Sequence, residues 1–309
     1  MSTAHVDAAR AASEYRAEGY AILRGLIPPD DAEELRRRSR VVYAAGMAHP
    51  CTYRHGNLVY EVLPETHFPS RYVVQAHWPA WEHPWFDAFR SRPEIGAVLA
   101  PLLGDDVKQV AQQIHWKPPG AGLTGYRFHQ DLRFRDAREA YGDVVADTVT
   151  VGIAIDRCTR DNGCLRVVPR SHLRGYLGLS DEGAPIMKGL TSDDELRGAG
   201  IDPSEVVDVE LEPGDAVIWG LLTVHGSLPN HSTRDRAFMI SSYVRGTSAR
   251  GEWAIRGGSP VTLGPEPSLC KFEDLDAWRT PRYVETAWYA DAPSGPARAA
   301  GAAAGSDPS

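Results

Sequence analysis

Paired cysteines, long apolar runs and blocks of positive charge are all missing from this 309-residue sequence. Its four cysteines, Cys51, Cys158, Cys164 and Cys270, form no CxxC pair. So few scattered cysteines in a long chain are typical of reduced thiols rather than of a disulfide framework, so a cytoplasmic protein is expected. No apolar run reaches the length of a membrane-spanning helix, and the acid-bearing first twenty residues lack the apolar segment of a secretory signal.

The charge balance is acidic. Lys and Arg total 33 against 41 Asp and Glu, a formal net charge of −8, and no run of five consecutive Lys or Arg residues occurs. Nucleic acid and anionic membranes attract proteins through clustered positive charge, so neither is an expected partner.

The first hundred residues have mostly helical patterns. The segment 28–47 opens with prolines and acidic residues, the chemistry of a helix N-terminus. Residues 48–72 are rich in aromatics and histidines without a clean period, which predicts a long ordered loop. The other predicted elements of this helical region, about 7–103, are helices at 7–18, 78–90 and 93–103 and a strand at 19–28.

From residue 107 onward, short alternating apolar runs are separated by Gly, Pro, Asp and Asn. This pattern predicts an all-β sandwich or barrel. The expected strands are 107–117, 126–134, 144–156, 164–169, 206–211, 215–219, 222–227 and 235–245. The polar insertion 171–205 has the length of a functional lid, and the low-complexity tail 290–309 is expected to be disordered. One domain, 1–289, accounts for the rest.

His129 and Asp131 stand two residues apart in "YRFHQDLRF" (126–134). With 11 His and 41 acidic residues in the chain, random placement gives roughly 1.5 His-x-Asp/Glu matches, so the pair alone decides little. On a strand, residues i and i+2 share a face, so both side chains can point to one place. The plain alternative is a buried histidine paired with a carboxylate.

His225 lies on a separate predicted strand and completes a set of two histidines and one carboxylate, which is the facial triad of non-heme Fe(II) oxygenases. Arg236 alternates with Phe238, Ile240 and Ser242 on the next strand and therefore faces inward. A buried arginine needs an anion, and a dicarboxylate cosubstrate supplies one through bidentate hydrogen bonds.

Four motifs in order carry a resemblance to a known family: "QQIHWKPPG" (112–120), "HQDL" (129–132), "RDNGCLRVVPRSH" (160–172) and "HGSLPNHSTRDRA" (225–237). Over about 107–245 the chain resembles the phytanoyl-CoA dioxygenase family of Fe(II)/2-oxoglutarate oxygenases. The resemblance implies a double-stranded β-helix, or jelly roll, at about 107–246, with the N-terminal helices packed outside. It also implies Fe(II) on His129, Asp131 and His225. Arg236 and Ser227 would hold 2-oxoglutarate, with Gln113 and Lys117 beside it.

The same resemblance implies an activity. Such enzymes use Fe(II), 2-oxoglutarate and O2, with ascorbate as a reductant, to hydroxylate an unactivated C–H bond and release succinate and CO2. The carboxylate of Asp131 occupies the position that halogenases leave open for chloride, which favours hydroxylation. Desaturation, epoxidation or ring formation use the same site. The substrate is expected to be a small molecule, such as a specialised metabolite.

The sequence departs from the family pattern at two positions. Gly152 stands where some relatives have a bulky residue, which predicts a roomier pocket. Arg170 replaces the usual glycine in "PRSH", and a local change of the turn is expected there.

Substrate contacts are less well defined. Arg127 shares the predicted face of His129 and either anchors an anionic substrate or forms a core ion pair. Trp116, Phe134 and Trp219 flank the site and either line the pocket or pack in the core. Two other classes of function remain: a Zn-dependent hydrolase with the same His/Asp/His set, which has no need of Arg236, and a non-catalytic jelly-roll binding protein.

Overall fold

The computed structural model describes residues 6–63, 71–120, 124–135, 138–179, 190–264 and 280–284. The predicted tail 290–309 lies outside these residues, as does part of the insertion, 180–189. No helix in the described part of the chain is both long enough and apolar enough to cross a membrane.

The N-terminal region contains the predicted helices and more strands than expected. Its elements are α1 (Ala8–Glu18), β1 (Tyr20–Leu23), α2 (Pro29–Met47), β2 (Tyr53–His55), β3 (Leu58–Leu63), β4 (Tyr72–His77), α3 (Pro84–Phe89) and α4 (Pro93–Leu103). The side chain of Asp7 caps α1, which ends at Gly19 with φ of +83°. Asp30 and Asp31 lie in the first turn of α2, where they complement the helix dipole.

The predicted loop at 48–72 is wrong where the structure describes it. Residues of β2 and β3 pair as antiparallel strands, and all six residues of β3 are buried. A strand covered on both faces has no polar-apolar alternation, so its sequence does not show the period of a half-exposed strand. Residues 64–70 lie outside the described part.

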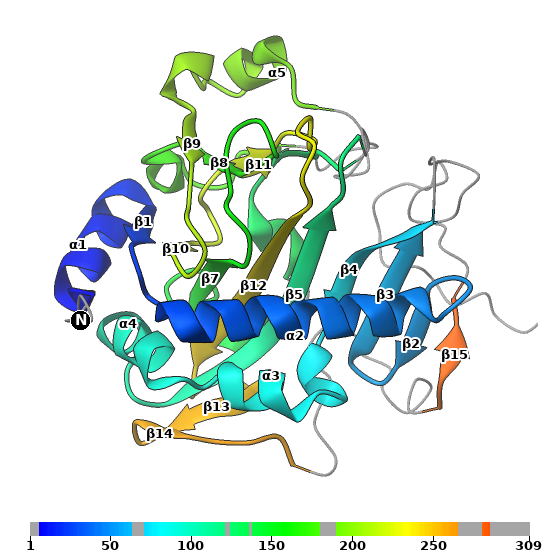
Figure 1. Ribbon diagram of the computed structural model, residues 1–309. Coiled ribbons are helices and arrows are strands. Elements are labelled where there is room, and N and C mark those ends of the chain that lie inside the picture. Colours follow the sequence, from blue (N-terminus) through cyan, green and yellow to red (C-terminus); the bar gives the residue numbers. More distant parts are fainter. Residues whose placement is uncertain are drawn as a thin grey trace, which may run out of the picture.

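Among the described residues of the second part of the chain, eleven strands follow. They are β5 (Val107–Lys117), β6 (Tyr126–His129), β7 (Thr148–Ala154), β8 (Leu165–Val167), β9 (Val207–Val209), β10 (Ala216–Trp219), β11 (His225–Ser227), β12 (Arg236–Arg245), β13 (Glu252–Arg256), β14 (Ser259–Pro260) and β15 (Arg282–Tyr283). The large sheet has the order β1-β10-β7-β12-β5-β4-β3-β2-β15, with β13 also on β5 (Figure 1). The small sheet has the order β6-β11-β8-β9. The two antiparallel sheets confirm the predicted jelly roll.

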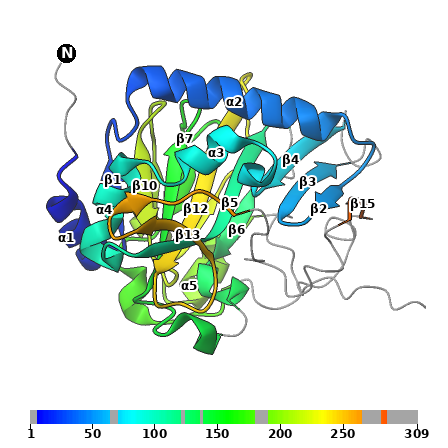
Figure 2. The ribbon, with the colours of Figure 1, turned by 90° about the horizontal axis from the view of Figure 1, so that it is seen from below.

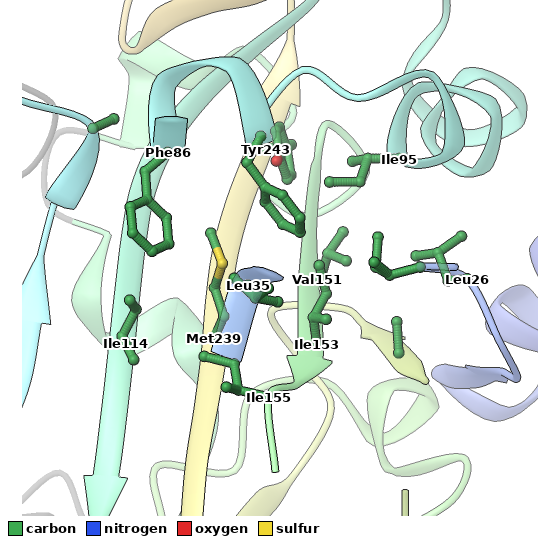
Figure 3. Close-up of a cluster of buried hydrophobic side chains, with 14 of the residues drawn as sticks. Leu26, Leu35, Phe86, Ile95, Ile114, Val151, Ile153, Ile155, Met239 and Tyr243 are labelled. Atoms are coloured by element: carbon green, nitrogen blue, oxygen red, sulfur yellow. The ribbon is translucent and has the colours of Figure 1, made fainter. Parts of the chain in front are cut away.

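The large sheet has two different faces. Helix α2 crosses one face, and Figure 2 shows it on the opposite side of the molecule from α5 (Asp193–Gly198). Leu35 of α2 packs there with Ile114 of β5, Ile153 of β7 and Met239 of β12 (Figure 3). These side chains lose their contact with water, which is the main favourable term in folding. The other face of the sheet is left for the functional site.

Two predicted segments differ in detail. The strand predicted at 126–134 ends at His129, and Asp131–Phe134 form a 3₁₀ helix. The insertion 171–205 contains α5, whose N-terminus has a capping box between Ser192 and Glu195. Whether the insertion acts as a lid stays a prediction.

Candidate metal centre

The two histidines come from neighbouring strands of the small sheet. His129 ends β6 and lies directly opposite His225, which begins β11. Their ring centroids are 4.3 Å apart. Asp131 begins the 3₁₀ helix just after β6, and its Oδ1 lies 3.6 Å from Nε2 of His129 and 3.5 Å from Nε2 of His225. Three ligand atoms therefore converge within 4.8 Å of one another.

Hydrogen bonds orient all three groups. Nδ1 of His129 lies 2.7 Å from the Arg127 carbonyl oxygen, and Nδ1 of His225 lies 2.9 Å from that of Thr223. A carbonyl only accepts, so each Nδ1 carries the hydrogen and each Nε2 presents its lone pair to the site. The indole Nε1 of Trp219 donates to Asp131 Oδ2 at 3.1 Å, which leaves Oδ1 facing the histidines.

The electrostatics suit a divalent cation. Burial lowers the pKa of His225 to about 4, which keeps its imidazole neutral at physiological pH. Burial raises the pKa of Asp131, but His225 and His129 more than offset this, so the pKa falls below its usual range and the carboxylate is ionised. The imidazoles of His129 and His225 and the carboxylate of Asp131, arranged on one side, match the donor set of a non-heme Fe(II) site.

A cationic group lies at the start of β12. Arg236 pairs in register with Lys117 of β5, and its Nη2 donates to the Gly163 carbonyl oxygen. The side chain of Arg236 is buried, and its Nε has no hydrogen-bond partner. An orphaned buried donor on a guanidinium fits an anionic ligand such as the far carboxylate of 2-oxoglutarate.

Lys117 contacts protein atoms with all its donors. Its Nζ donates to Ser227 Oγ at 2.6 Å, to the Leu228 carbonyl oxygen at 2.6 Å and to the Gly163 carbonyl oxygen at 3.2 Å. Burial, followed by the charge of Arg236, lowers the pKa of Lys117 well below its usual value. Lys117 thus holds Ser227 and the Gly163 loop in place. Gly163 has φ of +78°, and a Cβ there would overlap the Leu228 carbonyl oxygen.

A cavity of about 250 Å³ between the two sheets joins the triad to Arg236. Of the residues proposed from sequence, its lining includes Gln113, Ser227, Phe134 and Trp219. Gln113 Oε1 lies 2.9 Å from Nε2 of His115. The ring of Phe134 meets that of His129 edge-on at 5.7 Å.

Two of the proposed substrate residues lie elsewhere. Trp116 points to the opposite face of β5 and meets Tyr43 of α2 edge-on at 5.3 Å. Successive strand residues alternate faces, so Trp116 cannot share the face of Gln113 and Lys117. Arg127 forms an ion pair with Glu195 of α5 and donates to the Leu190 carbonyl oxygen. Arg127 and His129 would share a face of a regular strand. A register shift between β6 and β11 beside His129 interrupts that regular alternation.

The structure also adds residues that sequence reasoning missed. Arg135, Tyr141, Thr150 and Arg250 line the cavity. Arg135 follows the 3₁₀ helix, so no strand period pointed to it. The space left by Gly152 is filled, since a Cβ there would lie 2.5 Å from Phe238 and 2.8 Å from Trp219. The roomier pocket predicted at Gly152 is therefore not formed.

Residues 15–238 match the phytanoyl-CoA dioxygenase (PhyH) family, and the chain belongs to that family. It is 28% identical over 183 residues to dioxygenase lolE1 of Epichloe uncinata, covering 59% of this chain and 57% of the relative. It is 31% identical over 142 residues to methylphosphonate hydroxylase of Gimesia maris, covering 46% and 47%. The chain thus spans about half the length of these relatives.

Solved structures share the fold. EctD from S. alaskensis with 2-oxoglutarate and 5-hydroxyectoine superposes with a TM-score of 0.60 at 20% identity, covering 85% of this chain and 88% of that one. The alpha-ketoglutarate-dependent epimerase SnoN from nogalamycin biosynthesis superposes with a TM-score of 0.52 at 20% identity, covering 85% and 98%.

Proposed function

We propose that this protein is an Fe(II)/2-oxoglutarate-dependent dioxygenase that hydroxylates a C–H bond of a small molecule. One observation carries the proposal. A triad of two Nε2 atoms and one carboxylate oxygen shares a cavity with Arg236, whose buried Nε has no partner. A Zn-dependent hydrolase needs the triad but has no need of Arg236.

Each residue has a part in this chemistry. His129, Asp131 and His225 hold the iron, which, when bound, supplies oxygen activation coupled to the decarboxylation of 2-oxoglutarate. Arg236 binds the far carboxylate of 2-oxoglutarate, and Ser227, held by Lys117, lies beside it. Apolar lining from Trp219, Phe238, Ile240 and other residues limits water around the reacting groups.

Two points weigh against the alternatives. Among the described residues that line the cavity, Asp131 is the one carboxylate, so a hydrolase would have no second carboxylate to act as general base. A binding protein without catalysis needs no oriented set of three ligands. The names of two relatives, methylphosphonate hydroxylase and 2-aminoethylphosphonate dioxygenase, support a small substrate. We also propose that 1–289 form one domain, because β1 to β4 join the same sheet as β5, β7, β10 and β12.

The test is anaerobic spectroscopy with Fe(II) and 2-oxoglutarate. Wild type is expected to show the weak visible charge-transfer band of the ternary complex and to release succinate in air. Asp131→Ala should lose iron binding, whereas Arg236→Ala should keep iron and bind 2-oxoglutarate more weakly. Arg234→Ala is the matched control, since Arg234 is exposed two residues earlier. Tight Zn binding with no band in wild type would overturn the proposal.

A further inference from the structure

The cavity has two cationic ends. Arg236, Phe238, Ile240 and Ser242 follow one another along the inward face of β12, and all four line the cavity. Ser242 lies six positions after Arg236 along the strand, which is roughly 20 Å at the usual rise per residue. Arg135 lies at the Ser242 end, so one molecule of 2-oxoglutarate held by Arg236 leaves Arg135 without its anion.

Arg135 is fixed in place but not neutralised. Its Nη2 donates to Ser242 Oγ at 2.8 Å, and Ser242 Oγ lies 3.2 Å from Thr150 Oγ1. Its Nε is buried and has no hydrogen-bond partner among the described residues. In the described part of the chain no carboxylate lies within ion-pair distance of its guanidinium. A partly buried guanidinium with an orphaned donor is unfavourable unless a ligand completes it.

The triad lies close to this end. Trp219, which donates to Asp131, pairs in register with Thr150 of β7, and Thr150 pairs with Ser242 of β12. A group bound by Arg135 therefore lies next to the metal ligands, on the side away from Arg236.

We propose that Arg135 is the substrate anchor and that the substrate is a small organic anion whose carboxylate or phosphonate group binds this guanidinium. The inference rests on the proposed function and adds the chemical class of its substrate. Nε and Nη2 lie on one edge of the guanidinium. From this edge, arginine donates two parallel hydrogen bonds to a carboxylate or phosphonate. The cavity of about 250 Å³ has to hold 2-oxoglutarate as well, so the substrate is small.

Arg135 takes the role that the sequence suggested for Arg127. The guanidinium of Arg127 is engaged by Glu195 and by the Leu190 carbonyl oxygen, and Arg127 is absent from the cavity lining. Binding of the substrate anion at Arg135 gives 2-oxoglutarate and the substrate separate positions in the cavity. The cosubstrate lies toward Arg236, the substrate lies toward Arg135, and the metal ligands lie between them.

The test uses the anaerobic Fe(II)/2-oxoglutarate complex with acetate, methylphosphonate and neutral acetamide as probes. We expect acetate or methylphosphonate to perturb the charge-transfer band of wild type and acetamide to leave it unchanged. Arg135→Gln should weaken the apparent affinity for the active anion by about tenfold or more, because a charge-assisted bidentate contact is lost. The affinity for 2-oxoglutarate should stay unchanged, which separates this site from Arg236.

Arg133→Gln is the matched control. It removes the same charge two residues away, from a guanidinium that lies over the Phe134 ring and is absent from the cavity lining. Ser242→Ala keeps the charge of Arg135 and removes its hydroxyl anchor, so a severalfold weaker response is expected even if Arg135→Gln folds poorly. Two outcomes would overturn the proposed role of Arg135. In one, wild type has a normal band but neither anion perturbs it. In the other, wild type and Arg135→Gln respond equally to the anions. A missing band overturns the proposed function instead.

Discussion

Trp219 and Asp131 are joined by a hydrogen bond of 3.1 Å between the indole Nε1 and the carboxylate Oδ2. This bond fixes the rotation of the carboxylate, so that Oδ1 faces both histidine Nε2 atoms. The three ligand atoms are therefore oriented by the protein before any metal arrives.

Replacing the indole tests this orientation. Trp219→Phe keeps a ring in the cavity wall but removes the donor, so the affinity for Fe(II) should fall by about 10-fold to 100-fold. Anaerobic metal titration measures the change. Trp116→Phe, on the opposite face of the sheet, is the control and should bind metal like wild type. If Trp219→Phe bound Fe(II) as tightly as Trp116→Phe, the indole of Trp219 would not be what positions Asp131.

Lys117→Met tests the buried ammonium. The change removes three hydrogen bonds and leaves the partly buried Leu228 carbonyl oxygen without this donor. The free energy of unfolding should fall by about 2 kcal/mol, and 2-oxoglutarate should bind more weakly because Ser227 loses its support. Urea denaturation and band titration measure the two effects. Ser227→Ala should lower the free energy of unfolding by less than Lys117→Met does. A larger loss in Ser227→Ala would contradict the supporting role of Lys117.

Gly152→Ala should be destabilising because its new Cβ would lie 2.5 Å from the Phe238 ring. Overpacking of this kind costs about 1–3 kcal/mol. Phe238→Leu in the same chain should restore part of the loss, since the smaller side chain makes room. Gly198→Ala, with nothing near its Cβ position, is the control. Additive effects in a double-mutant cycle by urea denaturation would argue against this contact.

Arg170→Gly should raise stability. Arg170 has φ of +62°, which is left-handed backbone that costs a residue with a Cβ about 1 kcal/mol. This conformation gives a reason for the glycine that is usual in the family at this turn. Arg170→Ala removes the same side chain but keeps the Cβ, so the difference in thermal midpoint between the two variants isolates the backbone effect. No difference between them would contradict the explanation.

Two buried thiols predict a pH dependence. Burial raises the pKa of Cys158 to about 11 and that of Cys164 to about 12, above an ordinary value of 9.0. As the pH rises, the thiolates therefore form first in the unfolded chain. The contribution of the two buried thiols to the free energy of unfolding is complete below pH 9 and is lost as the pH rises toward 11–12. Alkylation at pH 8 with peptide mapping should modify half-buried Cys51 well before either thiol. Fast labelling of native Cys158 would be inconsistent with its burial.

The sequence by itself determined the parts that depend on neighbouring residues in the chain. Proline and acids at 28–31 placed the start of α2, and alternation gave β5 and β12 nearly to the residue. Motif spacing singled out His129, Asp131, His225 and Arg236, which the structure brings to one cavity. These signals are local because helix caps and strand alternation are set within a few residues.

Only the tertiary structure decided the rest. The sequence of β3 shows no strand period because all six of its residues are buried. The register shift beside His129 turns Arg127 toward α5, and the end of β6 turns Arg135 toward Ser242. Whether Arg127 lies in the cavity therefore depends on how β6 pairs with β11. Strand pairing joins residues distant in sequence, and a shift of one residue moves a side chain to the other face.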